Sequence, residues 1–320
     1  MRILFAGSPA IAAPSLKAVS GLELQGKGIV LAGVLTNPDR PRKHGGAQPA
    51  DVSVMASKLD EIRKQHGLLP IPQIKPEKLG EQARVEAAAL GADLLVSFAY
   101  GRIFGPRFLA LFPLGGINIH PSLLPKYRGA SPIQSAILAR EKETGICIQK
   151  LALEMDSGDI LASRRIKLSG RETALSLSET VSTSAAQLLE ELLSEYDSVS
   201  ASPQKGEAVY CREIKKEDGS IDWNKSAEDI DAQIRAFTPW PLSFTRRGND
   251  TLIILEAEPL EGGNNEAPGT VLGVDKNHGI LIQSGSGILA VSRLQWQARK
   301  PLDWKSFCNG ERGLIGSKLQ

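Results

Sequence analysis

The sequence predicts an α/β fold, in which a mostly parallel sheet with helices on both faces is followed by a small β-barrel. Three observations support this prediction. Apolar strand patterns alternate with helical patterns up to about residue 195, which is typical of strands joined by helical crossovers. The strands are continuously apolar, as in DLLVSF at 93–98, so both faces of the sheet are expected to be buried. Beyond Val209, short strands with Gly-rich turns replace the alternation.

Local signals place each element of the first domain. The apolar run at 2–6 stops at Gly7-Ser8-Pro9, and Pro9 suits the first turn of a helix that reaches about residue 19. Because a Gly-x-Gly-x-x-Gly fingerprint is missing and Pro9 removes a backbone amide, this unit argues against a dinucleotide cofactor. Periodicity predicts further strands at 29–36, 68–71, 93–98, 116–120, 145–153 and 160–168, and further helices at 52–65, 77–90, 132–140 and 173–195.

The second domain is expected to be a small barrel. One helix at 227–237 precedes predicted strands at 251–257, 269–274, 279–283 and 287–291. The Ser-rich segment 194–202 has the composition of an exposed linker. We therefore expect two domains, residues 1–208 and residues 209–320.

The composition limits the classes of function. With 320 residues, 42% hydrophobic and 23% charged, the chain has the make-up of a globular protein with a sizeable core. A net charge of +2 gives no global nucleic-acid signature, so such a partner must meet local basic patches. No apolar stretch approaches the ~20 residues of a membrane helix, and the N-terminus has a strand pattern rather than that of a signal peptide. The three cysteines form no CxxC pair, which argues against a disulfide framework or a metal site and fits the cytoplasm.

The segment 115–132, GGINIHPSLLPKYRGASP, carries the strongest chemical signal. Asn118 and His120 alternate with isoleucines on a predicted strand, so their side chains share one face, at the strand end where open α/β sheets place their sites. An amide N–H can donate to a developing oxyanion, and an imidazole can exchange a proton near neutral pH. Together with a nearby aspartate, these groups suit acyl transfer between nitrogens. The alternative is structural: Asn118 caps the following turn and His120 is a core histidine.

Two other segments also allow a functional and a structural interpretation. The loop MDSGD contains Asp156, and since Asp and Gly are ordinary turn formers, the loop by itself has a structural explanation that competes with a functional one. The turn of Ala99, Tyr100 and Gly101 either lines a flat pocket for a ring-shaped ligand or is a plain strand exit.

The loop 40–51 is rich in Gly and basic residues. It contains Arg40, Arg42 and Lys43 close together. It is either a flexible basic finger for phosphate or a solvated surface loop.

The segment 115–132 resembles the signature of the folate-dependent formyltransferases, which have an Asn-x-His strand end, a SLLP loop and a later Asp in the site. The resemblance implies that Asn118, His120 and Asp156 are catalytic. It also implies that the formyl donor is 10-formyltetrahydrofolate. The residues expected to hold this folate are the SLLP loop and the AYG turn, that is Ser122, Leu123, Leu124, Pro125, Ala99, Tyr100 and Gly101.

Motifs outside this segment indicate the acceptor. IDW at 221–223, IRAFTPWPLSF at 234–244 and APGTVL at 267–272 resemble the family members that formylate the α-amino group of methionyl initiator tRNA for translation initiation. The resemblance runs from Met1 to about Gly310. It implies a Rossmann-like catalytic domain, an OB-like barrel that binds tRNA, and a basic loop whose Arg40, Arg42 and Lys43 enter the acceptor stem. A monomer without metal or membrane attachment is expected.

Two features depart from the family pattern. The basic loop has more Gly and fewer Lys than is usual, and Ile11 stands where Phe is common beside the expected methionyl pocket. Other interpretations stay open. A formyltransferase for sugar-nucleotide amines or a formyl-folate hydrolase would share the catalytic segment, and an RNA-binding protein with a degenerate fold would not need Asn118.

Overall fold

The computed structural model describes residues 1–41, 45–263 and 265–320. The chain divides into two compact units, which are described separately. Unit 1 contains Met1–Pro132, Glu143–Lys167 and Ser178–Cys211, and unit 2 contains Ile133–Lys142, Leu168–Leu177 and Arg212–Gln320. The chain therefore leaves unit 1 and returns to it twice before its final passage into unit 2.

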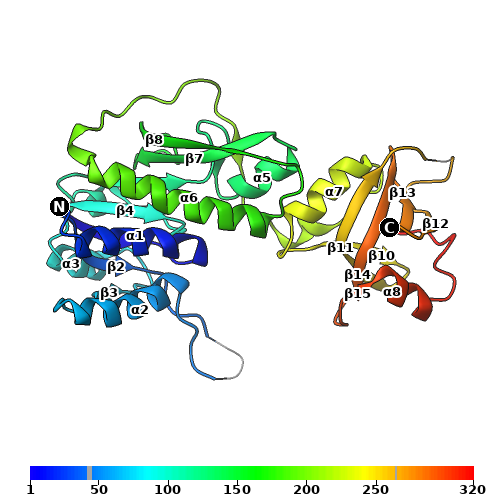
Figure 1. Ribbon diagram of the computed structural model, residues 1–320, viewed down its shortest axis with the longest axis horizontal. Coiled ribbons are helices and arrows are strands. Elements are labelled where there is room, and N and C mark those ends of the chain that lie inside the picture. Colours follow the sequence, from blue (N-terminus) through cyan, green and yellow to red (C-terminus); the bar gives the residue numbers. More distant parts are fainter. Residues whose placement is uncertain (42–44, 264) are drawn as a thin grey trace. The chain divides into compact units, whose positions relative to one another are not determined.

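Unit 1 is built on a seven-stranded sheet with the order β3-β2-β1-β4-β5-β7-β8 (Figure 1). Its strands are β1 (Arg2–Ala6), β2 (Val30–Leu35), β3 (Gln73–Ile74), β4 (Leu94–Phe98), β5 (Gly116–His120), β7 (Glu143–Lys150) and β8 (Ile160–Lys167). The strands from β1 to β5 pair in parallel, and β7 and β8 extend the sheet antiparallel. The predicted mostly parallel sheet is confirmed.

One strand lies later in the chain than predicted. The segment 68–71 contains no strand, and β3 begins at Gln73 instead. The cause is Pro70 and Pro72, which have no N–H to donate to a sheet ladder. The carbonyl of Pro72 still accepts the N–H of Val34 at 2.8 Å, so the pairing starts only where the prolines end.

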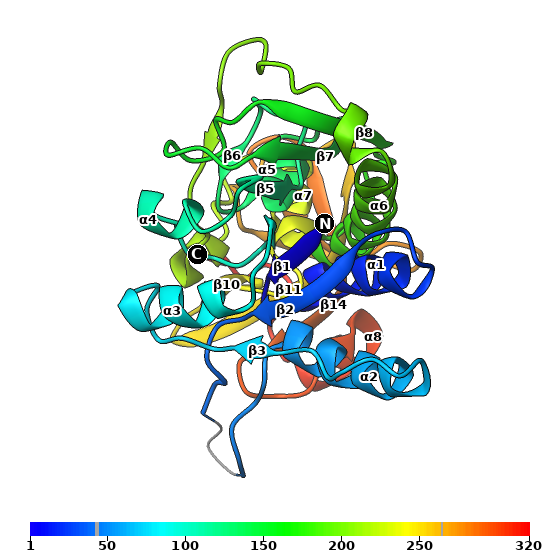
Figure 2. The same cartoon turned by 90° about the vertical axis from the view of Figure 1, so that its left-hand side faces the viewer.

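Helices cover both faces of this sheet. They are α1 (Ala13–Leu24), α2 (Asp51–Gln65), α3 (Glu81–Ala89), α4 (Pro106–Leu109) and α6 (Ala174–Ser194). Figure 2 shows α1, α2 and α6 on one face and α3 and α4 on the other. Four successive residues of β1, from Ile3 to Ala6, are therefore fully buried. Within the described ranges, no helix combines the length and the apolar character needed to cross a membrane.

A second, two-stranded sheet joins the segment after β5 to the last chain segment of unit 1. Strand β6 (Arg128–Gly129) pairs in parallel with β9 (Tyr210–Cys211). Before β9, Ser202 exchanges two backbone hydrogen bonds with Ile160, at 2.8 and 2.9 Å. The predicted Ser-rich linker is therefore docked at the start of β8.

Unit 2 is an antiparallel sheet with the order β10-β11-β14-β13-β12, and β15 pairs with β14. Its strands are β10 (Ser243–Arg247), β11 (Asp250–Leu260), β12 (Val271–Asp275), β13 (Gly279–Gln283), β14 (Ile288–Trp296) and β15 (Leu302–Asp303). The helices α7 (Ala227–Ala236) and α8 (Trp304–Gly310) belong to unit 2, and α5 (Pro132–Leu138) belongs to it from Ile133 onward. Ile230 and Ile234, one turn apart on α7, pack into a core with Leu252 and Ile254 of β11.

The last residues of the chain bridge the two edges of this sheet. Gln320 exchanges two backbone hydrogen bonds with Arg246 of the edge strand β10, at 2.8 and 2.9 Å. Ser317 accepts the N–H of Val271, in the opposite edge strand β12, at 2.9 Å. The OB-like barrel expected from the sequence is not closed by strand pairing, because in the described part of the chain β10 and β12 do not pair with each other. The C-terminal segment contacts both of these edge strands instead.

Candidate active site

Two polar side chains of β5 lie at the carboxyl edge of the parallel strands. In the register of the sheet, Asn118 stands opposite Ser97 of β4 and Gln149 of β7, and His120 stands opposite Cys147. Residues two apart on a strand share a face, so Asn118 and His120 point to the same side of the sheet. His120 is only 4% exposed, whereas Asn118 is half-buried.

Asp156 reaches both side chains from the loop between β7 and β8. Its Oδ1 lies 3.4 Å from the Asn118 Nδ2 that donates to it and 3.5 Å from Nδ1 of His120. The backbone of Asp156 is left-handed, with φ of 52°, a conformation that aspartate tolerates better than most residues. The structure therefore brings together the three residues that the sequence selects as catalytic.

Further donors fix the carboxylate of Asp156 in place. The amide Nε2 of Gln149 donates to Oδ1 at 2.9 Å, and the backbone N–H of Gly129 donates to Oδ2 at 2.9 Å. Gly129 has φ of 120°, and a Cβ at this position would lie 2.1 Å from the carbonyl oxygen of Cys211. Only glycine fits there, because the N–H must approach the carboxylate while β6 lies against β9.

One nitrogen of the His120 imidazole is hydrogen-bonded to a backbone carbonyl, and the other faces Asp156. Nε2 lies 2.8 Å from the carbonyl oxygen of Tyr127. A carbonyl only accepts hydrogen bonds, so Nε2 carries the proton in this contact. Nδ1 is then the nitrogen at which His120 gains or loses a proton, and the Asp156 carboxylate stands beside it.

Two opposing effects act on the pKa of His120. Burial lowers the pKa below its ordinary value, and the negative charge of Asp156 opposes this by favouring the imidazolium. Burial prevails, so the imidazole is neutral at physiological pH and can accept a proton at Nδ1.

The SLLP loop after β5 is fixed by its own contacts. The hydroxyl of Ser122 is buried and donates to the carbonyl of Lys126 at 2.5 Å. Leu123 packs against Gly145, where a Cβ would lie 2.4 Å from its side chain. The N–H of Leu124 points at Sγ of Cys147 at 3.4 Å. The loop is thus held in one conformation next to His120.

The AYG turn separates into a buried and an exposed part. The ring of Tyr100 is 2% exposed and stacks on Phe104 with 5.2 Å between ring centroids. Ala99 and Gly101 are exposed, and the carbonyl of Tyr100 accepts the side chain of Asn37 at 3.0 Å. The surface that this turn offers to a ligand is therefore its backbone and Ala99, while the tyrosine ring belongs to the core.

The predicted basic loop is only partly described. Arg40 is exposed and exchanges two backbone hydrogen bonds with Gln48, at 2.9 and 2.7 Å. Arg42 and Lys43 lie outside the described residues.

Several residues at this site were missed by the sequence analysis. Gln149 and Gly129 contact the Asp156 carboxylate, and Gln204 contacts its backbone carbonyl at 2.8 Å. A signal existed for Gln149, because it is a polar residue that directly follows the apolar run 146–148 on a strand predicted to be buried. No such signal marks Gln204, which follows the predicted linker 194–202.

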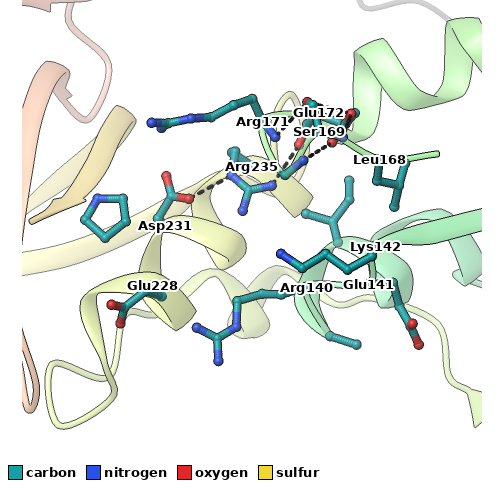
Figure 3. Close-up of a pocket in the computed structure, with 14 residues that line it drawn as sticks. Arg140, Glu141, Lys142, Leu168, Ser169, Arg171, Glu172, Glu228, Asp231 and Arg235 are labelled. Carbon is teal, nitrogen blue, oxygen red and sulfur yellow. Dashed lines mark hydrogen bonds and ion pairs between the residues drawn. The ribbon is translucent and has the colours of Figure 1, made fainter.

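A separate cavity of about 560 Å³ lies in unit 2 (Figure 3). Its charged lining residues are Arg140, Glu141, Lys142, Arg171, Glu172, Glu228, Asp231 and Arg235. In Figure 3 the carboxylate of Asp231 and the guanidinium of Arg235 point toward each other, and Oδ2 accepts Nε at 2.8 Å. None of the predicted site residues lies there. Among the described residues, no group of three or more His, Cys, Asp and Glu side chains is arranged to hold a metal ion.

Comparison with known proteins identifies the class of protein. The model of the formyl transferase family matches residues 1–193, and the model of the formyl transferase C-terminal domain matches residues 213–312. The chain belongs to the formyl transferase family.

Individual relatives narrow this class. A methionyl-tRNA formyltransferase of Treponema denticola is 48% identical over 320 residues, covering 97% of each chain. Among solved structures, the sugar 3N-formyl transferase WlaRD, described in the presence of dTDP and 5-N-formyl-THF, matches 94% of this chain and 99% of its own, with a TM-score of 0.63 and 18% identity. HypX from Aquifex aeolicus in complex with tetrahydrofolic acid matches with a TM-score of 0.58 and 18% identity, and this chain spans about half of it, 46%. These two structures support the fold.

Proposed function

We propose that this protein is a methionyl-tRNA formyltransferase, which transfers the formyl group of 10-formyltetrahydrofolate to the α-amino group of methionyl initiator tRNA. The observation that carries the chemistry is the convergence of Asn118 and His120 on one oxygen of Asp156, at 3.4 and 3.5 Å. The similarity over the whole chain to the T. denticola methionyl-tRNA formyltransferase supports the acceptor.

In the proposed reaction, the α-amino nitrogen attacks the formyl carbon and a tetrahedral intermediate forms. The new oxyanion needs a donor, which the Nδ2 amide of Asn118 supplies. The attacking amine must lose a proton, and Nδ1 of His120 accepts it beside Asp156, whose negative charge stabilises the resulting imidazolium. The folate nitrogen leaves as the carbonyl re-forms, and the same proton returns to that nitrogen. The products are formyl-methionyl-tRNA and tetrahydrofolate.

The substrates are proposed to bind on either side of this trio. The SLLP loop, residues 122–125, and the AYG turn, residues 99–101, hold the folate. The rigid contacts of Ser122 and Leu124 support this, because a fixed loop loses little entropy on binding. Arg40, together with Arg42 and Lys43, meets the phosphates of the acceptor stem.

The domain roles follow the same proposal. Residues 1–208 form the catalytic domain, and residues 209–320 form the barrel that binds tRNA. A single chain supplies the whole trio, so we propose a monomer. We place the enzyme in the cytoplasm, where its aminoacyl-tRNA substrate is made.

A transfer assay tests this function. The purified protein is incubated with formyl-labelled 10-formyltetrahydrofolate and methionyl initiator tRNA, and the label is expected on the aminoacyl-tRNA. Parallel reactions contain an aminated sugar nucleotide or no acceptor. Label found only on the sugar amine, or only in released formate, would overturn the tRNA assignment.

A further inference from the structure

A chain of side-chain hydrogen bonds leads away from the carboxylate of Asp156. Gln149 donates its Nε2 to Oδ1 of Asp156 at 2.9 Å and accepts Nε2 of Gln204 on its own Oε1 at 3.2 Å. Gln204 in turn accepts two N–H groups of Arg128 on Oε1, from Nη2 at 2.8 Å and from Nε at 3.1 Å. The order of donation is therefore Arg128 to Gln204 to Gln149 to Asp156.

The guanidinium of Arg128 fixes the direction of this chain. A guanidinium only donates, so the oxygen of Gln204 must face it and the NH₂ of Gln204 must point away. The NH₂ of Gln204 therefore faces the side-chain oxygen of Gln149, and the NH₂ of Gln149 then faces Asp156. Reversing either amide would place an amide oxygen against the carboxylate or an NH₂ group against the guanidinium.

Gln204 also holds the backbone of the Asp156 loop. Its NH₂ donates to the carbonyl of Asp156 at 2.8 Å and to that of Gly158 at 2.9 Å. The NH₂ has two hydrogens, so the longer 3.2 Å contact with Oε1 of Gln149 shares one of them. The loop has little freedom at this point, because a Cβ on Gly158 would lie 1.8 Å from the carbonyl oxygen of Lys150. Asp156 itself is in a left-handed conformation with φ of 52°. Such a residue persists only where its surroundings hold it.

The outer end of the chain is anchored at a more exposed cluster. The guanidinium of Arg128 lies 5.9 Å from the centroid of the Tyr210 ring and 3.8 Å from the carboxylate of Glu154. The hydroxyl of Tyr210 donates to Glu154 at 3.0 Å. The outer end of the chain therefore carries the ionisable side chains of Arg128, Glu154 and Tyr210. Nearer to His120, Cys147 stands opposite it in the sheet, and the thiol of Cys211 donates to the same Tyr127 carbonyl that His120 contacts.

We propose that Gln149 and Gln204 are positioning residues for Asp156. Gln149 aims the carboxylate at Asn118 and His120, and Gln204 fixes both the loop backbone and the orientation of the Gln149 amide. The inference rests on the proposed role of Asp156 in formyl transfer. It also assigns a task to the segment before β9, which brings Gln204 into the site.

The first test measures the titration of His120 by NMR in the full chain without substrates. The variants are Gln149→Leu and Gln204→Leu, and a His120→Asn spectrum assigns the signal. The pKa of His120 is expected to fall in both variants, because the charge of Asp156 is no longer held beside Nδ1. Gln233→Leu is the matched control, since Gln233 is a buried glutamine in unit 2 that donates to three backbone carbonyls. The control should leave the His120 titration unchanged.

The second test measures turnover with formyl-folate and methionyl-tRNA. Each variant should lower kcat about tenfold while KM for both substrates stays within about twofold, because an interaction that aligns the reacting groups is lost and ground-state binding is retained. The kcat of the double variant should lie within about threefold of the kcat of the less active single variant, because the effects of two substitutions in one hydrogen-bond network are not additive.

The two tests separate the possible failures. An unchanged His120 titration in Gln149→Leu and Gln204→Leu, or fully additive losses of kcat, would overturn the positioning role. If Gln149→Leu does not fold, the half-exposed Gln204→Leu alone decides. If the wild-type protein transfers no formyl group to tRNA but the His120 titration still moves, the positioning stands and the proposed function fails.

Discussion

Two aspartates whose side chains are largely shielded from solvent are held in opposite ways. Asp156, in unit 1, meets the N–H groups of Gln149, Gly129 and Asn118 and the imidazole of His120. Asp231, in unit 2, is 4% exposed and pairs through Oδ2 with Arg235, one turn along α7. Its Oδ1 has no hydrogen-bond partner among the described residues.

Under the proposed function, Asp156 is a carboxylate that takes part in the chemistry, whereas Asp231 has a structural role. The donors to Asp156 carry no full charge, so its negative charge stays available to His120, where it favours the imidazolium. Asp231 is neutralised by a guanidinium. Burial nevertheless raises the pKa of Asp231, and the hydrogen bond from Arg235 opposes this. We expect substitutions around Asp156 to change turnover, and substitutions around Asp231 to change stability.

The largest contrast is expected between Asp156→Asn and Asp231→Asn. The first keeps the shape of the side chain but removes the charge beside His120, and kcat should fall by about 10²- to 10⁴-fold, the usual size of a general acid–base contribution. The second should leave kcat within about twofold. Steady-state kinetics with methionyl-tRNA measures kcat of both variants. An equal loss of kcat in the two variants would contradict the different roles given to Asp156 and Asp231.

The next contrast removes one donor from each aspartate. Asn118→Ala should lower kcat by about 100-fold or more if its amide donates to the oxyanion. Arg235→Ala should instead cost about 3 kcal/mol of unfolding free energy, because Asp231 is left buried and unpaired. The matched control is Asn224→Ala, whose amide contacts the exposed Asp222. Near-normal turnover of the purified Asn118→Ala variant would show that Asn118 is not catalytic.

A third contrast compares two loop glycines. Gly158→Ala would place a Cβ 1.8 Å from a backbone carbonyl in the Asp156 loop, so the loop must shift. We expect a loss of about 1–3 kcal/mol of unfolding free energy, measured by urea denaturation, together with a lower kcat. Gly170, beside the unit 2 cavity, has φ of 85° and open space around it. Gly170→Ala should cost about 1 kcal/mol from backbone strain and leave kcat unchanged.

The smallest effect is the response of stability to pH. His120 has a folded-state pKa lowered from 6.5 by burial, so below pH 6.5 the unfolded chain binds the extra proton first. Its contribution therefore destabilises the fold as the pH falls below 6.5. Asp231 has a folded-state pKa raised from 3.8, so acidification toward 3.8 stabilises the fold through this group.

Urea denaturation between pH 7 and pH 4 checks these two signs. His120→Asn should flatten the loss of stability that begins near pH 6.5 in the wild-type protein. Asp231→Asn should remove the opposing gain at lower pH. A wild-type curve that Asp231→Asn leaves unchanged would contradict the structural role given to that residue.

Much of the fold was predictable because its signals are local. Continuous apolar strands alternating with helices indicated the covered parallel sheet, and Gly-rich turns indicated the second domain. The strand predicted at 68–71 was wrong, since the lack of an N–H at Pro70 and Pro72 outweighs the apolar character of Leu68, Leu69 and Ile71. The predicted linker at 194–202 carries two sheet-like hydrogen bonds from Ser202, which its serine-rich composition did not reveal.

The candidate site was predictable in part. The Asn118 and His120 pair follows from the two-residue period of a strand, and the later Asp156 came from a family resemblance. Their roles stay predictions. The sequence left open whether the AYG turn lines a pocket or is a plain strand exit. The ring of Tyr100 is buried in the core, a direction that a single aromatic in a turn does not reveal.

The sequence alone determined which side chains share a strand face, since that depends only on backbone geometry. It also determined where the strands are apolar enough to be covered on both sides. Only the tertiary structure decided which distant groups meet Asp156. Asn118 is 38 residues from Asp156 along the chain, and Gln204 is 48 residues from it. Such contacts depend on strand register and loop packing, which local residue preferences do not encode.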